Sequence, residues 1–160
     1  MPTSQDIFDT LAALGVAVPA EIRPQGRYDL VLVHQGLAQV SGQVPRLDNS
    51  GTLLAGRLEA DQDLEAARAA ARLCLARALV ALHQELGDLT RVERLISLRG
   101  FVNAAPDFQR HGQVMDAASE LAIALFGEAG RHIRSSLGVS SLPGGALVEI
   151  ELTAAVARPH

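Results

Sequence analysis

A short segment near the C-terminus alternates strictly between aliphatic and acidic residues, Val148-Glu149-Ile150-Glu151-Leu152. Successive side chains of an extended strand point to opposite faces of a sheet. The three aliphatic side chains are therefore expected to face a core, and both glutamates to face the other side. A chain with this strand must cover one face of its sheet and leave the other polar, or meet a partner there.

Helical patterns supply the covering layer. The strongest runs from about Asp61 to Leu86, with acidic residues at its start and a mainly apolar face. A second helix is expected from about Gln113 to Phe126, and a short one over residues 4–14, ended by Gly15.

Extended segments fill the remainder of the chain. They are expected at 28–33 and 37–43, joined by a glycine turn, at 91–102, and near 134–140 and 146–156. Two long helices against one sheet of five to six strands make an α+β, two-layer sandwich. With 160 residues the chain is expected to form one domain, residues 26–160, preceded by a helix and linker at 1–25.

The last two strands are predicted to pair as a hairpin whose polar face carries the candidate site. On this prediction Arg134 and Ser136 share that face with Glu149, while Leu137 and Val139 face the core. A solvated, salt-bridged outer face is the alternative. The small Ser136 leaves room on the face, and an uncovered sheet face is commonly buried in an oligomer. The second alternative is therefore a functional site at or near a subunit boundary.

Composition excludes several classes of function. The net charge is −4, the basic residues form no stripe, and only five aromatic residues are available for stacking, so nucleic acid is a poor partner. The chain contains no lysine, which excludes Schiff-base, pyridoxal-phosphate and standard phosphate-loop chemistry.

Compartment and metal content are also constrained. A single cysteine, Cys74, cannot form an intramolecular disulfide, no apolar run is long enough for a membrane span, and no signal peptide is evident. A cytoplasmic location without membrane contact is expected. The five histidines show no paired metal-binding spacing, so neither a metal nor a cofactor is expected.

Several motifs occur in a recognisable order: Gly26-Arg27-Tyr28, Val40 to Pro45 (VSGQVP), Arg134 to Val139 (RSSLGV), Leu142-Pro143, and Val148 to Glu151 (VEIE). Together they resemble the RidA family of YjgF-like proteins, also called the endoribonuclease L-PSP family, over about residues 26–156. The stretches 101–108 (FVNAAPDF) and 127–132 (GEAGRH) are similar to a longer subgroup with an extra N-terminal helix.

The resemblance implies a chorismate-mutase-like fold with a mixed sheet, assembled as a homotrimer with clefts between subunits. It implies a hydrolase, a cofactor-independent deaminase that converts reactive enamines and imines to 2-oxo acids and ammonia. Arg134 would hold the substrate carboxylate and Glu149 would activate the attacking water. Tyr28 would close the cleft, Ser41 and Gly42 would line it, and Ser136 stands where many relatives carry cysteine.

Some alternatives stay open. Asp116 occupies a position where relatives often carry asparagine, so it either enters the cleft, where it would repel a carboxylate, or is an exposed helical aspartate. His132 either caps the approach to Arg134 or lies in a surface loop. A non-catalytic ligand-binding or regulatory role is the main functional alternative; an endoribonuclease is disfavoured by the acidic charge.

Overall fold

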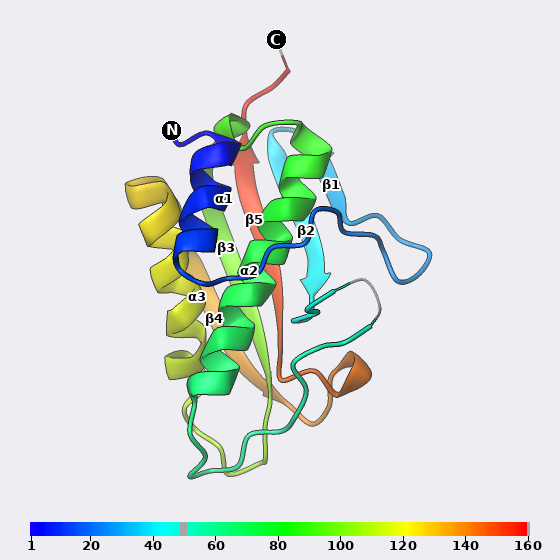
Figure 1. Cartoon of the computed structure of the whole chain (residues 1–160), viewed down its shortest axis with the longest axis vertical. Helices are drawn as coiled ribbons and strands as arrows, with labels where there is room; N and C mark the ends of the chain where they lie inside the picture. Colours follow the sequence, from blue (N-terminus) through cyan, green and yellow to red (C-terminus); the bar gives the residue numbers. More distant parts are fainter. Residues whose placement is uncertain (49–50, 160) are drawn as a thin grey trace.

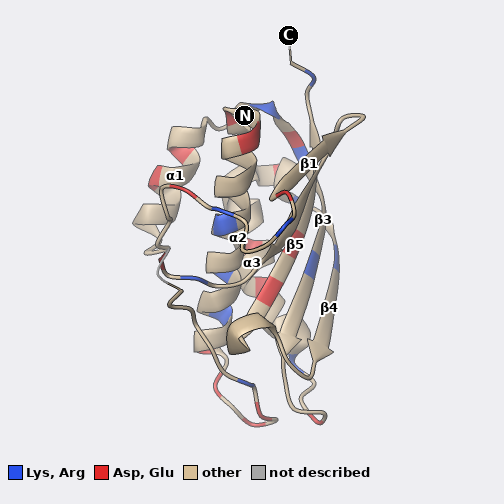
Figure 2. Ribbon diagram, turned by 90° about the vertical axis from the view of Figure 1, so that its right-hand side faces the viewer, with Lys and Arg blue, Asp and Glu red and all other residues tan. Residues whose placement is uncertain are grey.

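The alternating segment is the first half of a long strand, β5 (Val148–Val156), in which buried and half-buried residues alternate throughout. Its buried side chains face a layer of helices, as predicted. The computed structural model describes residues 1–48 and 51–159. Figure 2 shows the helices of these residues on one side of the sheet and none of them on the other.

The described residues form a mixed, five-stranded sheet with the order β1-β2-β5-β3-β4. β1 (Val31–His34) and β2 (Leu37–Gln43) form the predicted hairpin, and β5 pairs antiparallel with both β2 and β3 (Val92–Asn103). β4 (Ile133–Val139) pairs with β3 in parallel. The prediction of a β4–β5 hairpin is wrong, because β3 lies between these two strands (Figure 1).

The connection between β3 and β4 explains this arrangement. It contains α3 (His111–Phe126) and the 3-10 turn η2 (Gly127–Gly130), and a helical crossover of this kind makes consecutive strands parallel. The shorter β4–β5 connection, with the turn η3 (Pro143–Gly145), passes the end of β3. There the backbone amides of Asn103 and Ala104 donate to the carbonyls of Leu147 and Val139.

α2 (Glu65–Leu86) is the centre of the helical layer and begins at Glu65 rather than near Asp61. Its buried positions are mostly alanine and leucine, and it packs against α3, β5 and β2. Small side chains allow close approach between helix and sheet, which explains why so much of this helix is buried. None of the described helices is long and apolar enough to cross a bilayer.

α1 (Ser4–Ala13) is the predicted N-terminal helix. Thr3 and Asp6 form a capping box at its start, and Ile7 and Leu11 enter the same hydrophobic core as the sheet. The Ser4 hydroxyl accepts a 2.8 Å hydrogen bond from the amide of Leu89, in the 3-10 turn η1 (Leu89–Arg91) that follows α2. α1 is therefore packed onto the domain rather than attached loosely to it.

The sheet face opposite the helices is uncovered in the single chain. Several large apolar side chains are exposed there: Leu32 by 63%, Ile133 by 72% and Leu137 by 47%. Exposed aliphatic residues on an otherwise polar sheet face are typical of a surface that meets a partner.

Candidate functional site

Glu149 lies on the open face of the sheet, as predicted, opposite Phe101 of β3. Its side chain is half-buried in a cavity of about 100 Å³. Tyr28 and Gly42 line the same cavity, so three of the predicted site residues come together within one chain.

The close approach of Gly42 to Glu149 depends on an irregularity in β2. Val40 pairs with Leu152 and Gln43 with Ile150, so β2 has one more residue than β5 in this interval, a β-bulge. A Cβ atom built on Gly42 would lie 2.1 Å from Oε1 of Glu149 and 2.9 Å from its Cδ. Only glycine leaves the space that the carboxylate occupies.

The pKa of Glu149 is raised above its ordinary value, first because burial disfavours the charged form and second because Glu151 lies on the same face. Glu151 is held by an ion pair with Arg99, at 3.6 Å. A carboxylate with a raised pKa is a better general base, because it binds a proton more strongly.

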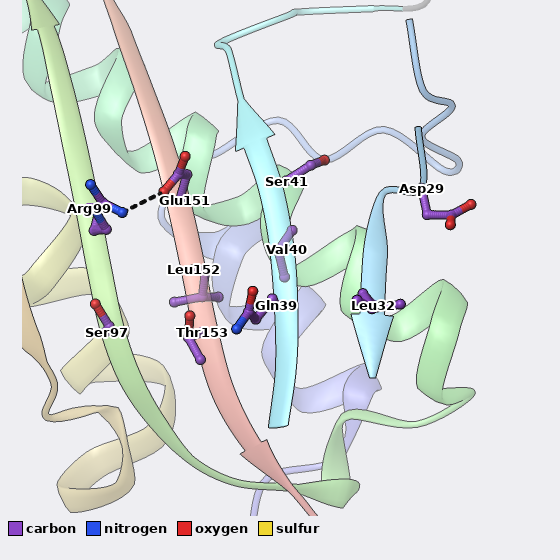
Figure 3. A pocket seen from close by; sticks show the side chains of 10 residues that line it. All are labelled: Asp29, Leu32, Gln39, Val40, Ser41, Ser97, Arg99, Glu151, Leu152 and Thr153. Carbon is purple, nitrogen blue, oxygen red and sulfur yellow. Dashed lines mark ion pairs between the residues drawn. The ribbon is translucent and has the colours of Figure 1, made fainter. Parts of the chain in front are cut away.

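Tyr28 and Ser41 lie at the edges of this region. Tyr28 precedes β1 rather than lying within it; its ring is half exposed, and its hydroxyl accepts a 3.3 Å hydrogen bond from the amide of Gln25. Ser41 lines an adjoining groove of about 400 Å³, in which the Arg99–Glu151 ion pair is found (Figure 3).

Arg77 also lines the cavity that contains Glu149, and the sequence did not predict it as a site residue. It projects from α2, is only 4% exposed, and donates a 3.3 Å hydrogen bond to the carbonyl of Arg46, which also lines the cavity. Its Nε atom has no partner among the described residues, and burial lowers its pKa. The available signal was a single arginine within residues 73–82 (LCLARALVAL), which are otherwise apolar.

Arg134 does not lie on the open face, and this prediction is wrong. Leu98 of β3 pairs with Arg134 on one side and with the buried Leu152 on the other, so Arg134 is on the helix side of the sheet. There its Nη1 atom donates to Oδ1 of Asp116 at 2.9 Å and to the hydroxyl of Ser119 at 3.1 Å.

The other side chains of β4 also face the side of the sheet opposite to the one predicted. The hydroxyl of Ser136 is buried on the helix side with no hydrogen-bond partner among the described residues, and a Cβ on Gly138 would lie 2.5 Å from the His111 ring on α3. The apolar Ile133 and Leu137 instead point to the open face. The assumption that aliphatic residues face the core fails because β4 is an edge strand whose outer face is uncovered in the single chain.

Arg134 and Glu149 therefore lie on opposite faces of the sheet, on strands separated by β3. The predicted residues form two groups. We call Tyr28, Gly42 and Glu149, with the adjoining Ser41, the open-face group, and Arg134, Ser136 and Asp116 the edge group.

Asp116 and His132 both belong to the surroundings of Arg134. Asp116, on α3, is half exposed and ion-paired with Arg134. His132 bonds through Nδ1 to the carbonyl of Gly130, which can only accept, so Nδ1 carries a hydrogen. In the neutral ring Nε2 then accepts from Ser119, at 2.9 Å. Ser119 thus links His132 to Arg134. Asp116 and His132 are therefore both bonded within the edge group rather than free on the surface.

Comparison with known proteins identifies the family. A family model described as "YjgF/chorismate mutase-like, putative endoribonuclease" matches residues 9–156. The chain belongs to the YjgF/RidA family. Among relatives of this YjgF/RidA protein, protein TCP17 of Trypanosoma cruzi is 38% identical over 142 residues, covering 88% of each chain.

Solved structures of other proteins agree with the YjgF/RidA assignment and with the chorismate-mutase-like fold. Protein Atu1372 of Agrobacterium tumefaciens is 35% identical, with a TM-score of 0.84 and 94% of each chain covered. A "putative endoribonuclease" of Shewanella oneidensis is 30% identical, with a TM-score of 0.84, covering 94% of this chain and 99% of that one.

Proposed function

We propose that this YjgF/RidA protein hydrolyses carboxylate-bearing imines and enamines to 2-oxo acids and ammonia, in clefts between adjacent subunits of a homotrimer. The observation that carries the proposal is the half-buried Glu149, whose raised pKa and cavity suit a base that activates water. The same fold is found in E. coli TdcF, whose structure has bound serine, a small molecule with a carboxylate and a nitrogen (21% identity, TM-score 0.54).

The two groups of residues account for an inter-subunit site. Arg134 and Glu149 cannot reach the same small molecule within one chain, because the sheet separates them. If the edge group of one subunit faces the open-face group of the next, both can contact one substrate. The exposed Leu32, Ile133 and Leu137 on the open face support burial of that face by a second copy.

The chemistry requires few groups. Arg134 binds the substrate carboxylate, and Glu149 accepts a proton from the water that attacks the imine carbon. From the protonated imine this gives a neutral carbinolamine, whose nitrogen takes that proton back from Glu149. As the carbon–nitrogen bond breaks, the hydroxyl proton passes to Glu149 and the carbonyl of the 2-oxo acid forms. Glu149 gives this proton to the departing ammonia, which leaves as ammonium, and is ionised again. Imines already hydrolyse in water, so orientation of the reactants supplies most of the required acceleration.

The proposal is tested by forming 2-iminobutanoate in situ with an amino-acid deaminating enzyme and following the release of 2-oxobutanoate and ammonia. The protein is expected to accelerate release, and Arg134→Ala and Glu149→Gln to abolish the acceleration. Equal rates with the wild type, either variant and no added protein, across a panel of imines, would refute the deaminase.

A non-catalytic ligand-binding role is the second candidate, and the serine bound in the structure of E. coli TdcF favours it, because serine is a stable amino acid rather than a reactive imine. This role predicts that the protein binds small amino or oxo acids without changing the rate of imine hydrolysis. Ribonuclease activity has less support, because basic and acidic residues are interspersed over the described part of the chain (Figure 2).

A further inference from the structure

The cavity that contains Glu149 is also lined by a buried positive charge. Arg77 reaches the cavity from α2 in the helical layer, whereas Glu149 reaches it from β5 of the sheet. Only 4% of Arg77 is exposed, and no ion pair between the described residues includes it. A buried arginine without a counter-ion is costly, because it has lost contact with water without gaining an opposite charge. An anionic group in the cavity would remove this cost.

Glu149 does not compensate the charge of Arg77. A carboxyl group paired with an arginine has a lowered pKa, but the pKa of Glu149 is raised, first by burial and second by Glu151. The other charge close to Arg77 has the same sign. Burial lowers the pKa of Arg77, and the guanidinium of Arg46, which lines the same cavity, acts in the same direction. An anion close to two guanidinium groups is attracted by both.

The guanidinium of Arg77 has a donor for such an anion. Its Nη1 atom donates a 3.3 Å hydrogen bond to the carbonyl of Arg46. Its Nε atom is enclosed by protein and has no partner among the described residues. Nη2 also makes no hydrogen bond with the described residues, but it is not among the enclosed atoms, so it can donate into the cavity. A hydrogen bond from a guanidinium to a carboxylate is about twice as strong as one between neutral groups.

The size of the cavity limits what can bind in it. Its volume of about 100 Å³ holds a few water molecules or the end of a ligand. A pocket that encloses a whole small-molecule ligand usually has roughly 300–1,000 Å³. In the proposed inter-subunit site, Arg134 binds the carboxylate next to the imine carbon, and Glu149 activates the water that attacks this carbon. The cavity is then available to the far end of the substrate.

We infer that Arg77 is a specificity-determining residue: it binds a second carboxylate at the far end of the substrate, so that the preferred substrates are the imines of dicarboxylic amino acids. This inference rests on the proposed function for the reacting group and for the position of the first carboxylate. An apolar end group in the cavity leaves the buried guanidinium without a counter-ion. A site with a buried polar group rejects ligands that cannot pair with it, so the discrimination is expected to be strong.

The test compares ligands of equal length that differ only at the far end. 2-Oxoglutarate and 2-oxopentanoate share their carbon chain and their 2-oxo acid group, but one ends in a carboxylate and the other in a methyl group. Oxaloacetate and 2-oxobutanoate are the same kind of pair, one carbon shorter. Binding to the purified full-length protein is measured by titration calorimetry or NMR. In at least one pair we expect the dicarboxylate to bind about tenfold more tightly, or better.

Arg77→Met is expected to remove this preference by weakening the dicarboxylate, because methionine fills similar space without a charge. Arg72→Met is the matched control. It removes the same charge from the same helix, at a residue that is paired with Glu65 and does not line the cavity. It should keep the wild-type preference. Arg77→Gln replaces Arg77→Met if the methionine variant does not fold.

Four results would overturn the inference: no preference in either pair by the wild type, no binding of any of the four ligands, an unchanged preference in Arg77→Met, or an equal loss in Arg72→Met. The imine assay, run with the imines of each pair, separates the inference from the proposed function. Hydrolysis without the binding preference contradicts only the role of Arg77, and the preference without hydrolysis contradicts only the deaminase.

Discussion

The carboxylate of Glu149 occupies the space where any other residue at position 42 would have its Cβ, 2.1 Å from Oε1. Gly42→Ala is therefore expected to move the carboxylate rather than to be accommodated. A displacement of about 1 Å at a reacting group can lower kcat/KM by about 100-fold. The imine assay measures the loss.

Gly87→Ala is the control for a general loss of stability. Gly87 ends α2 with φ +81°, and a Cβ there meets nothing within 4 Å. The alanine is strained by about 1–2 kcal/mol but lies far from Glu149 in the sequence and outside both groups of site residues. If both variants lose activity to the same extent, displacement of Glu149 is not the cause.

The charge of Glu149 is expected to cost stability at neutral pH. The folded protein binds this proton more strongly than the unfolded chain, because the pKa is raised from its ordinary 4.5. Between that value and the raised one the folded state carries more protons, so stability falls as pH rises. Glu149→Gln should therefore be more stable than wild type at pH 7, with the difference vanishing below pH 4.5. Chemical denaturation at several pH values measures this; a less stable variant at pH 7 would contradict it.

Glu151 is expected to influence the acidic limb of the pH–rate profile through the pKa of Glu149. The catalytic form of Glu149 is ionised, so activity falls as pH drops through its pKa, and Glu151 contributes to raising that pKa. Glu151→Gln should shift the limb to lower pH. An unchanged limb would mean that a different group controls activity. Asp107→Asn, a substitution outside both site groups, should leave the limb in place.

Mixed assemblies test whether the site is shared between subunits. Arg134→Ala and Glu149→Gln proteins are inactive alone in this proposal, but co-expression places an intact Arg134 beside an intact Glu149 at some interfaces. For random trimers about one quarter of the sites are complete. Recovery near that fraction of wild-type activity is expected, whereas a site built within each chain would show none.

The buried hydroxyl of Ser136 is expected to lower stability, because it lacks a hydrogen-bond partner among the described residues. Ser136→Ala removes this unsatisfied group and should raise the free energy of unfolding by about 1 kcal/mol. Ser135→Ala, at the neighbouring exposed position, is the control and should change little. Denaturant titration distinguishes the two; a destabilised Ser136→Ala would show that the hydroxyl has a partner in the assembled protein.

The sequence predicted those parts of the fold that depend on local pattern. α1, α3 and the strands appear close to their expected positions, and the alternation of β5 gave the correct face for Glu149 because a central strand has one face against the helices. The same rule failed for Arg134. β4 is an edge strand, and its apolar Ile133 and Leu137 face away from the helical layer.

The pairing between strands could also not be predicted from the local sequence pattern. Nothing in residues 134–156 indicates that β3 inserts between β4 and β5, since this follows from the route of α3. The resemblance brought Gly42 and Glu149 together as site residues, but only the bulge in β2 explains why position 42 must be glycine. Arg77 was missed because a helical pattern counts it as a polar break in an apolar face.

The attachment of α1 has a consequence for the order in which the protein assembles. Ser4 bonds to the amide of Leu89, eighty-five positions further along the chain, and Phe8 stacks edge-on against His83. During synthesis the chain emerges from its N-terminus, so α1 leaves the ribosome long before its docking surface exists. α1 is therefore made well before the residues that fix it in place, and until then its apolar side is exposed to chaperones and proteases.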